Sequence, residues 1–160
     1  MRKAAALAAG LLILLFVNFG IHQRELLVTE GRIVLLRLAP VDPRSLMQGD
    51  YMRLNFEVTN QAFGWRAKPG LADGYIVVGL DANRVGTFRR FADDKPLAPN
   101  EVALRYRIRN GQPKFATNAF FFQEGRAKAF EGAQYGEFRV APDGEMILTN
   151  LRGPRLEPLR

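Results

Sequence analysis

The sequence predicts a mainly β protein, a small antiparallel barrel or sandwich of about seven strands with one short helix, preceded by an N-terminal transmembrane helix. Two features of the chain indicate this architecture. A long apolar run follows the first three residues, and beyond residue 31 short stretches of alternating apolar and polar residues recur between turns rich in Gly, Pro, Asn and Asp. Once the apolar run is set aside, about 130 residues remain, which is the size of one domain.

The apolar run covers residues 4–21 and is interrupted only by Gly10, Asn18 and Gly20. As a helix, roughly 18 residues rising about 1.5 Å each extend about 27 Å, close to the thickness of the hydrocarbon core of a bilayer. Residues 17–21 offer a poor small-x-small cleavage site, so we expect an uncleaved anchor. The predicted organisation is an anchor and stalk at 1–30, a β-rich domain at 31–152 and a frayed C-terminal tail at 153–160.

The orientation of the predicted anchor does not follow from charge alone. Two basic residues precede the apolar run, and three lie close behind it: Arg2 and Lys3, then Arg24, Arg32 and Arg37. The usual arrangement of an uncleaved signal anchor holds the charged N-terminus inside the cell. We therefore expect a single-pass protein of a bacterial inner membrane, with its C-terminal domain on the extracytoplasmic (periplasmic) side.

The strands of the predicted domain are read from their alternation and from the turns that end them. The clearest example places Tyr51, Met52, Leu54, Phe56 and Val58 in one strand, because apolar residues repeat there with a period of two. We expect strands at residues 32–38, 51–58, 75–80, 85–91, 102–109, 115–122, 136–141 and 145–151. Asn110-Gly111 predicts a tight hairpin, since both residues tolerate a positive φ.

Two segments late in the chain complete the predicted domain. Residues 123–131 combine alanines with charged residues of good helix propensity and are expected to form the one short helix. Just before it, Phe120-Phe121-Phe122 needs apolar surroundings. We expect those three rings to enter the core of the domain, with a protein partner or lipid as the alternative.

Composition excludes several kinds of chemistry. The chain has no cysteine, so thiol catalysis, disulfides and thiolate metal sites are excluded. Its one histidine, His22, lies at the end of the apolar run, which leaves a zinc site or a Ser/His/Asp triad without its usual histidine. No calcium-binding loop, P-loop or dinucleotide fingerprint is present, and we predict no metal and no cofactor. The net charge of +7 would favour nucleic acid in a soluble protein, but membrane attachment argues against it.

The most distinctive motif is PVDPRSLMQGDYMRLNFEV at residues 40–58. Its first part has the chemistry of a turn, because Asp42 can accept backbone N–H bonds, Pro43 presets φ and Gly49 permits a left-handed step. Asp50 can cap nearby amides or pair with Arg44. Two interpretations remain open: a structural turn that positions the following strand, or an exposed recognition site of Arg44, Asp50 and Tyr51.

At these residues the sequence resembles the GDYxxLxY family, which is named for its motif. Gly49, Asp50, Tyr51 and Leu54 match that motif, and Phe56 stands where the family name has tyrosine. The change keeps the ring and removes a hydroxyl, so a role that requires the oxygen does not carry over to Phe56. The resemblance implies an N-terminal anchor and a small extracytoplasmic domain, and it brings no assigned reaction.

These observations favour a non-enzymatic, membrane-anchored accessory domain that binds a partner, most simply an integral membrane protein beside it. The candidate binding residues are Asp42, Pro43, Arg44, Gly49, Asp50, Tyr51, Leu54 and Phe56. One alternative is a Ser/Lys hydrolase similar to signal peptidases, with Ser45 as the nucleophile. In those enzymes serine directly precedes methionine, whereas Leu46 separates Ser45 from Met47, and Lys68, Lys95, Lys114 and Lys128 lie in no motif that identifies a general base.

A second alternative is a module that binds anionic lipid or an anionic polymer. Arg105, Arg107 and Arg109 share one face of the predicted strand 102–109 and would form a basic stripe about 13 Å long. The same stripe is also what a sheet edge uses to avoid aggregation, and we favour that interpretation.

Overall fold

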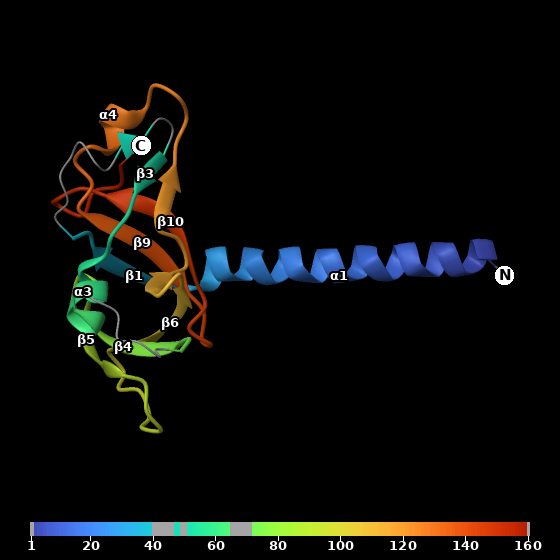
Figure 1. Cartoon of the computed structure of the whole chain (residues 1–160), viewed down its shortest axis with the longest axis horizontal. Coiled ribbons are helices and arrows are strands. Elements are labelled where there is room, and N and C mark those ends of the chain that lie inside the picture. The colour runs from blue at the N-terminus through green and yellow to red at the C-terminus, as the bar shows by residue number, and fades with distance from the viewer. Residues whose placement is uncertain (1, 40–46, 49–50, 65–71, 160) are drawn as a thin grey trace.

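The computed structural model describes residues 2–39, 47–48, 51–64 and 72–159. A long helix, α1 (Arg2–Glu30), projects from a β domain that holds every other element (Figure 1). The fold is mainly β, as the sequence predicts. The predicted Arg44–Asp50 pair and Ser45 lie outside the described residues, as do Asp42, Pro43, Gly49 and Lys68.

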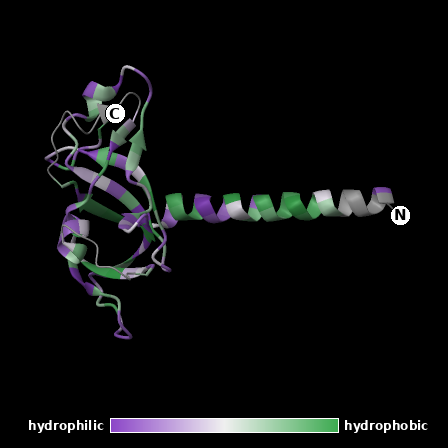
Figure 2. Cartoon of the chain, viewed as in Figure 1, coloured by the Kyte–Doolittle hydropathy of each residue, from purple (hydrophilic) through white to green (hydrophobic). Residues whose placement is uncertain are grey.

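Helix α1 is long and apolar enough to cross a membrane over Ala9–Glu30, and its most apolar stretch is not buried against the protein. Figure 2 shows the apolar residues concentrated along this helix, with polar residues where it nears the β domain. The expected stalk is therefore helical up to Glu30. Leu27 is buried, and Gly31 approaches the Leu27 carbonyl so closely that a Cβ atom would lie 2.3 Å from that oxygen. A larger residue at position 31 would force helix and domain apart.

Seven strands form a curled, nearly closed sheet, which we call the barrel sheet. Their order is β10-β9-β1-β5-β4-β6-β7. Their bounds are β1 (Arg32–Arg37), β4 (Gly74–Leu80), β5 (Val85–Phe91), β6 (Glu101–Arg109), β7 (Gln112–Phe115), β9 (Tyr135–Val140) and β10 (Met146–Arg152). All neighbours are antiparallel except β1 and β5, which pair in parallel. The turn after β9 reaches β6, where the Arg105 N–H donates to the Gly144 carbonyl at 3.0 Å.

The core lies inside this curled sheet. The alternation predicted for residues 102–109 is confirmed, because Val102, Leu104 and Tyr106 are all buried. The predicted hairpin is confirmed as well: Asn110 and Gly111 have φ of 54° and 70°, and they join β6 to β7. The largest fully buried side chains come from six strands of the barrel sheet, from β3 and from the segment after β3, and include Phe56, Phe115, Phe138, Leu36, Ile76 and Leu104.

Three short strands form a second sheet, which we call the small sheet. It consists of β2 (Met47–Gln48), β3 (Tyr51–Arg53) and β8 (Ala119–Phe121), in that order. The strand predicted over residues 51–58 is therefore too long. Its backbone stays extended to Phe56, which bridges Leu38, and then α3 (Glu57–Phe63) begins. Alternate side chains are buried along the whole stretch without a continuous ladder, which explains the misleading pattern.

The single strand predicted over 115–122 is two strands in different sheets. Strand β7 ends at Phe115, and Ala116 has a positive φ of 26° that turns the chain away. Thr117 then makes hydrogen bonds through its hydroxyl to both the N–H and the carbonyl of Ala119, so local bonds replace the ladder. Strand β8 leaves this turn to pair with β3.

The last predicted elements are present with changed bounds. The helix expected at 123–131 is a single turn, α4 (Ala127–Phe130), because Gly125 has a φ of 80° and the chain before it is not helical. The tail expected to be frayed at 153–160 is instead folded back on β10. Its backbone forms a turn between Gly153 and Glu157, and the Leu159 N–H donates to the Leu151 carbonyl at 3.0 Å.

Candidate functional site

The small sheet carries residues 47–48 and 51–53 from the middle of the sequence motif and lies beside the barrel sheet. Within β3, Met52 is buried, whereas Tyr51 is half-buried and Arg53 is exposed. Figure 1 shows β3 at the end of the domain opposite β4 and β5, away from the point where α1 joins. The small sheet therefore presents its outer face at the side of the domain.

Tyr51 and Phe121 form an aromatic pair on that face. The two residues lie directly opposite each other in the β3–β8 register, and their ring centroids are 5.7 Å apart with a tilt of 38°. Phe121 is 74% exposed, more than any other large apolar side chain that the structure describes in the β domain. Aromatic side chains are enriched at protein interfaces relative to the rest of the protein surface.

The neighbouring phenylalanines point the other way. The ring of Phe120 packs edge-on against Phe130 at 5.1 Å, and Phe122 stacks on the same ring at 5.5 Å. Strand alternation thus divides the Phe120-Phe121-Phe122 run. The expectation that all three enter the core is wrong for Phe121 and confirmed for its two neighbours.

A buried polar atom lies where β3 leaves the small sheet. The Leu54 N–H donates to the Asn118 carbonyl at 2.7 Å, which continues the β3–β8 pairing. The side-chain oxygen Oδ1 of Asn118 is buried and has no hydrogen-bond donor in the described structure. Such an orphan acceptor costs about 1–3 kcal/mol and is uncommon in native folds. The hydrogen-bonding groups at this junction are therefore less completely paired than a buried site usually requires.

The three arginines of the predicted basic stripe share one face of β6, as expected. Each of them forms an ion pair with a carboxylate. Arg105 and Arg107 each hold Oε1 of Glu145 at 2.6 Å, and Arg109 lies 3.5 Å from the Asp73 carboxylate. Strand β6 is also an interior strand, paired with β4 and β7, so the edge-protection interpretation is wrong. The stripe instead ties β6 to the turn before β10.

Asp73 has the one clearly perturbed carboxylate in the described structure. The Ile108 N–H donates to its Oδ1 at 2.7 Å, and this bond holds the pKa of Asp73 below its ordinary value of 3.8. Burial opposes the shift, and the charge of Arg109 adds to it. Within the described ranges, no three His, Asp or Glu side chains gather where they could hold a metal ion.

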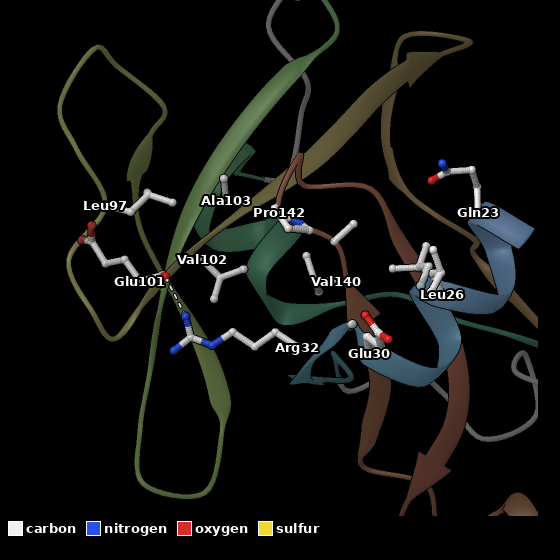
Figure 3. Close-up of a pocket in the computed structure, with 13 residues that line it drawn as sticks. Gln23, Leu26, Glu30, Arg32, Leu97, Glu101, Val102, Ala103, Val140 and Pro142 are labelled. Carbon is white, nitrogen blue, oxygen red and sulfur yellow. Dashed lines mark hydrogen bonds between the residues drawn. The ribbon is translucent and has the colours of Figure 1, made fainter.

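A hollow of about 490 Å³ lies where α1 meets the barrel sheet, and we call this region the α1 junction. Figure 3 shows apolar side chains from both parts around it, among them Leu26, Val102, Val140 and Pro142. Arg32 crosses the same region and donates to the carbonyls of Glu101 and Pro99 at 3.2 and 3.0 Å. These bonds attach the first residue of β1 to the segment that precedes β6.

Comparison with known protein families finds one match, to the model described as GDYXXLXY protein, over residues 13–151. The chain belongs to the GDYXXLXY family. The match covers most of the chain and includes the end of α1, the barrel sheet and the small sheet. The comparison with curated proteins and the comparison with solved structures give no match.

The described residues of the GDYXXLXY motif divide between the small sheet and the core of the domain. Leu54 and Phe56 are core residues, each 2% exposed, and the Phe56 ring packs edge-on against Phe138 at 5.2 Å. A tyrosine hydroxyl at position 56 would need its own partner in this apolar environment, so phenylalanine suits the site. Tyr51 is the motif residue on the surface side. Gly49 and Asp50 lie outside the described residues.

Sequence reasoning missed Phe121 as a site residue in this GDYXXLXY protein. The signal was present, since three consecutive aromatic residues cannot all face one side of a strand. The pairing of Phe121 with Tyr51 was not readable, because it depends on the break at Ala116 that sends β8 into another sheet. Glu145 was missed for a similar reason, as it lies about 40 residues from the arginines it binds.

Proposed function

We propose that this GDYXXLXY protein is a membrane-anchored accessory domain that docks on an integral membrane protein through the small sheet. The observation that carries the proposal is the Tyr51–Phe121 pair, in which the half-buried Tyr51 ring contacts the 74% exposed Phe121 ring. Aromatic anchors held on a rigid element are the typical hot spots of protein interfaces. The proposal includes a single-pass anchor in a bacterial inner membrane, with the β domain in the periplasm.

The geometry of α1 supports the anchoring part of the proposal. Within the helix that is long and apolar enough to cross a membrane, the apolar run at residues 4–21 extends about 27 Å at about 1.5 Å per residue, compared with a hydrocarbon core of about 30 Å. Because Leu27 is buried against the domain, helix and barrel sheet meet without a flexible linker. The β domain is thereby kept next to the bilayer, where its most accessible partners are other membrane proteins.

The position of the small sheet supports docking from the side. Strands β2 and β8 each have one neighbour in this sheet, and β3 lies between them. With α1 taken as the membrane normal, Figure 1 places β3 to one side of the domain, away from the axis of α1. A partner with a periplasmic segment beside the anchor reaches Phe121 without displacing any part of the barrel sheet.

Co-purification in mild detergent tests the docking proposal. The full-length chain is expected to retain an integral membrane protein, and Phe121→Ser is expected to lower the recovery at least tenfold, as loss of an aromatic hot spot does. Leu97→Ser is the matched control, because Leu97 is 47% exposed and belongs to the α1 junction. Equal recovery with all three chains would refute docking through the small sheet.

A separate experiment tests on which side of the membrane the β domain lies. The chain has no cysteine, so one introduced cysteine is a unique reporter. Arg155 is exposed in the turn after β10, and Arg155→Cys is expected to react with a membrane-impermeant maleimide in intact spheroplasts. Labelling only after the membrane is permeabilised would place the β domain in the cytoplasm and contradict the proposal.

A further inference from the structure

Three arginines surround a second hollow at the end of the barrel sheet that faces α1. The hollow measures about 540 Å³, and Arg32, Arg84 and Arg139 line it together with Asp81 and the backbone of Asn100. It is separate from the small sheet and from the stripe on β6. The proposed docking surface does not include this hollow.

The strand directions place this hollow toward the membrane. Strand β1 begins at Arg32, directly after α1, and β5 runs parallel to it. The start of β5, the end of β4 and the start of β6 must therefore lie at the same end of the barrel sheet as the start of β1. That end carries residues 80–84 and 99–101, and the chain enters it from α1.

The arginines are held in place by uncharged groups. Arg139 donates to the Gly31 carbonyl at 3.1 Å, and Arg32 donates to the two backbone carbonyls described above. Neither of them, nor Arg84, forms an ion pair within the described residues. The Asp81 carboxylate accepts the N–H groups of Asn83 and Val85 at 2.8 and 2.9 Å. Three arginines and one carboxylate thus line the hollow and give it an excess of positive charge, in contrast to the paired arginines of β6.

Arg84 occupies a backbone conformation that favours glycine. Its φ is 64°, and its N–H closes the turn by donating to the Asp81 carbonyl at 3.0 Å. A residue with a Cβ atom is strained in this region, and strain of this kind is often found at binding sites. The turn presents the Arg84 side chain at the rim of the hollow.

The hollow lies on the membrane side of the domain, above the lipid headgroups, when α1 spans the bilayer. The apolar run ends at Ile21, and Gly31 is the first residue along the chain after this run that lines the hollow. The ten residue steps between them rise about 15 Å, and one headgroup layer is about 5–8 Å thick. The end of the barrel sheet that carries the arginines therefore lies within about 10 Å of the outer surface of the headgroups.

We propose that this hollow binds the phosphate of an anionic phospholipid headgroup through Arg32, Arg84 and Arg139. A guanidinium presents two parallel N–H donors that match phosphate oxygens, and excess positive charge next to a bilayer selects anionic lipid over zwitterionic lipid. The inference rests on the anchored arrangement in the proposed function and is independent of docking through the small sheet. Bound lipid would fix the tilt of the domain on the membrane.

Native mass spectrometry of the full-length chain in detergent micelles tests the inference. The probes are phosphatidylglycerol and phosphatidylcholine with identical acyl chains, in equal amounts. We expect several-fold more phosphatidylglycerol than phosphatidylcholine on the wild-type chain. Arg84→Gly is expected to reduce that excess about fivefold, the effect of one cation near an anionic surface, and Arg84→Lys is expected to retain most of it. Arg155→Gln removes one charge at an exposed turn and is expected to leave the excess unchanged.

Three results would overturn the inference. They are equal retention of the two lipids by the wild-type chain, an excess that Arg84→Gly does not reduce, and displacement of phosphatidylglycerol by an equal concentration of inorganic phosphate. The Arg84→Gly chain should fold, with an unchanged or raised Tm, because glycine relieves the positive φ. Carbonate extraction of membranes reports separately on anchoring, and co-purification reports on docking, so failure of either differs from failure of the lipid site.

Discussion

The barrel sheet and the small sheet differ in how fully they bury their apolar side chains. In the barrel sheet, the large residues facing inward are almost completely buried, and Glu145 seals the last turn against β6 through two arginines. In the small sheet, three strands of two or three residues hold the most exposed large apolar side chain described in the β domain. The barrel sheet thus supplies most of the core, whereas the small sheet contributes Met52 to that core and leaves Phe121 exposed, which is the basis of the docking proposal.

The family motif joins these two regions. Leu54 and Phe56 belong to the core of the barrel, whereas Tyr51 belongs to the surface of the small sheet. Changes in the two parts of one short motif should therefore have different consequences.

The largest effect on stability is expected in the core. Phe56→Ala should lower the free energy of unfolding by about 3–5 kcal/mol, because it removes a fully buried ring and its contact with Phe138. Phe121→Ala should lower it by less than about 1 kcal/mol, since the ring is mostly exposed. Urea denaturation of the full-length chain in detergent, followed by circular dichroism, measures both. Similar losses for the two variants would contradict the division between the sheets.

The next effect concerns the ion pair between the edge strand β10 and its neighbour β9 in the barrel sheet. Arg152 Nε lies 2.5 Å from Oε2 of Glu137, whose side chain is only 10% exposed. Arg152→Ala should cost about 3 kcal/mol, because it leaves a carboxylate nearly buried without its partner. A combined Glu137→Leu and Arg152→Leu chain should recover most of the loss. Failure of the double variant to recover would mean that Arg152 acts mainly through its hydrogen bond to the Leu156 carbonyl.

A smaller effect is expected where the barrel sheet closes. Glu145→Gln should lower the free energy of unfolding by about 1 kcal/mol, because it weakens bonds to two partly exposed arginines, Arg105 and Arg107. The wild-type advantage should shrink as salt is raised, since exposed ion pairs are screened. Denaturation curves at low and high salt measure both effects. The matched control is Glu131→Gln, because Glu131 is exposed at the end of α4. Glu157→Gln would not serve, because the Glu157 carboxylate accepts the Arg155 N–H in the turn of the folded tail.

The smallest effect is a pH dependence of the free energy of unfolding, which Asp73 causes. Its pKa is lowered in the folded chain, so the stability it contributes is present above the ordinary value of 3.8 and is lost as the pH falls through the folded pKa. Between pH 5 and pH 3 the wild-type chain should therefore lose more stability than Asp73→Asn. Parallel pH curves for the two chains would show that the bond from the Ile108 N–H does not depend on the charge.

The sequence predicted most of the fold because periodicity follows burial. Residues 102–109 alternate and form β6 as expected, and the turn at Asn110-Gly111 has the positive φ angles that its residues favour. Residues 51–58 alternate as well, yet only their first part is a strand, since burial on one side needs an extended chain and not a ladder. The folded tail was missed because hydrogen bonds between Gly153 and Glu157 leave no periodic signal.

The candidate site was only half readable from the sequence. Tyr51 was identified from the motif, whereas its partner Phe121 depends on a contact between segments about 70 residues apart. Pairing of distant strands is set by the whole topology and not by local propensity. The arginines of the second hollow were missed for the same reason, since the strand order brings Arg32, Arg84 and Arg139 together.

The most direct test of the central claim is photo-crosslinking in living cells from a benzophenone amino acid placed at Phe121 or, in a separate chain, at Leu97. Both positions are exposed, one on the small sheet and one at the α1 junction. We expect position 121 to crosslink to an integral membrane protein and position 97 to give at most a weak trace of the same product. Crosslinks to that protein from position 97 and none from position 121 would place the docking surface at the α1 junction and contradict the account.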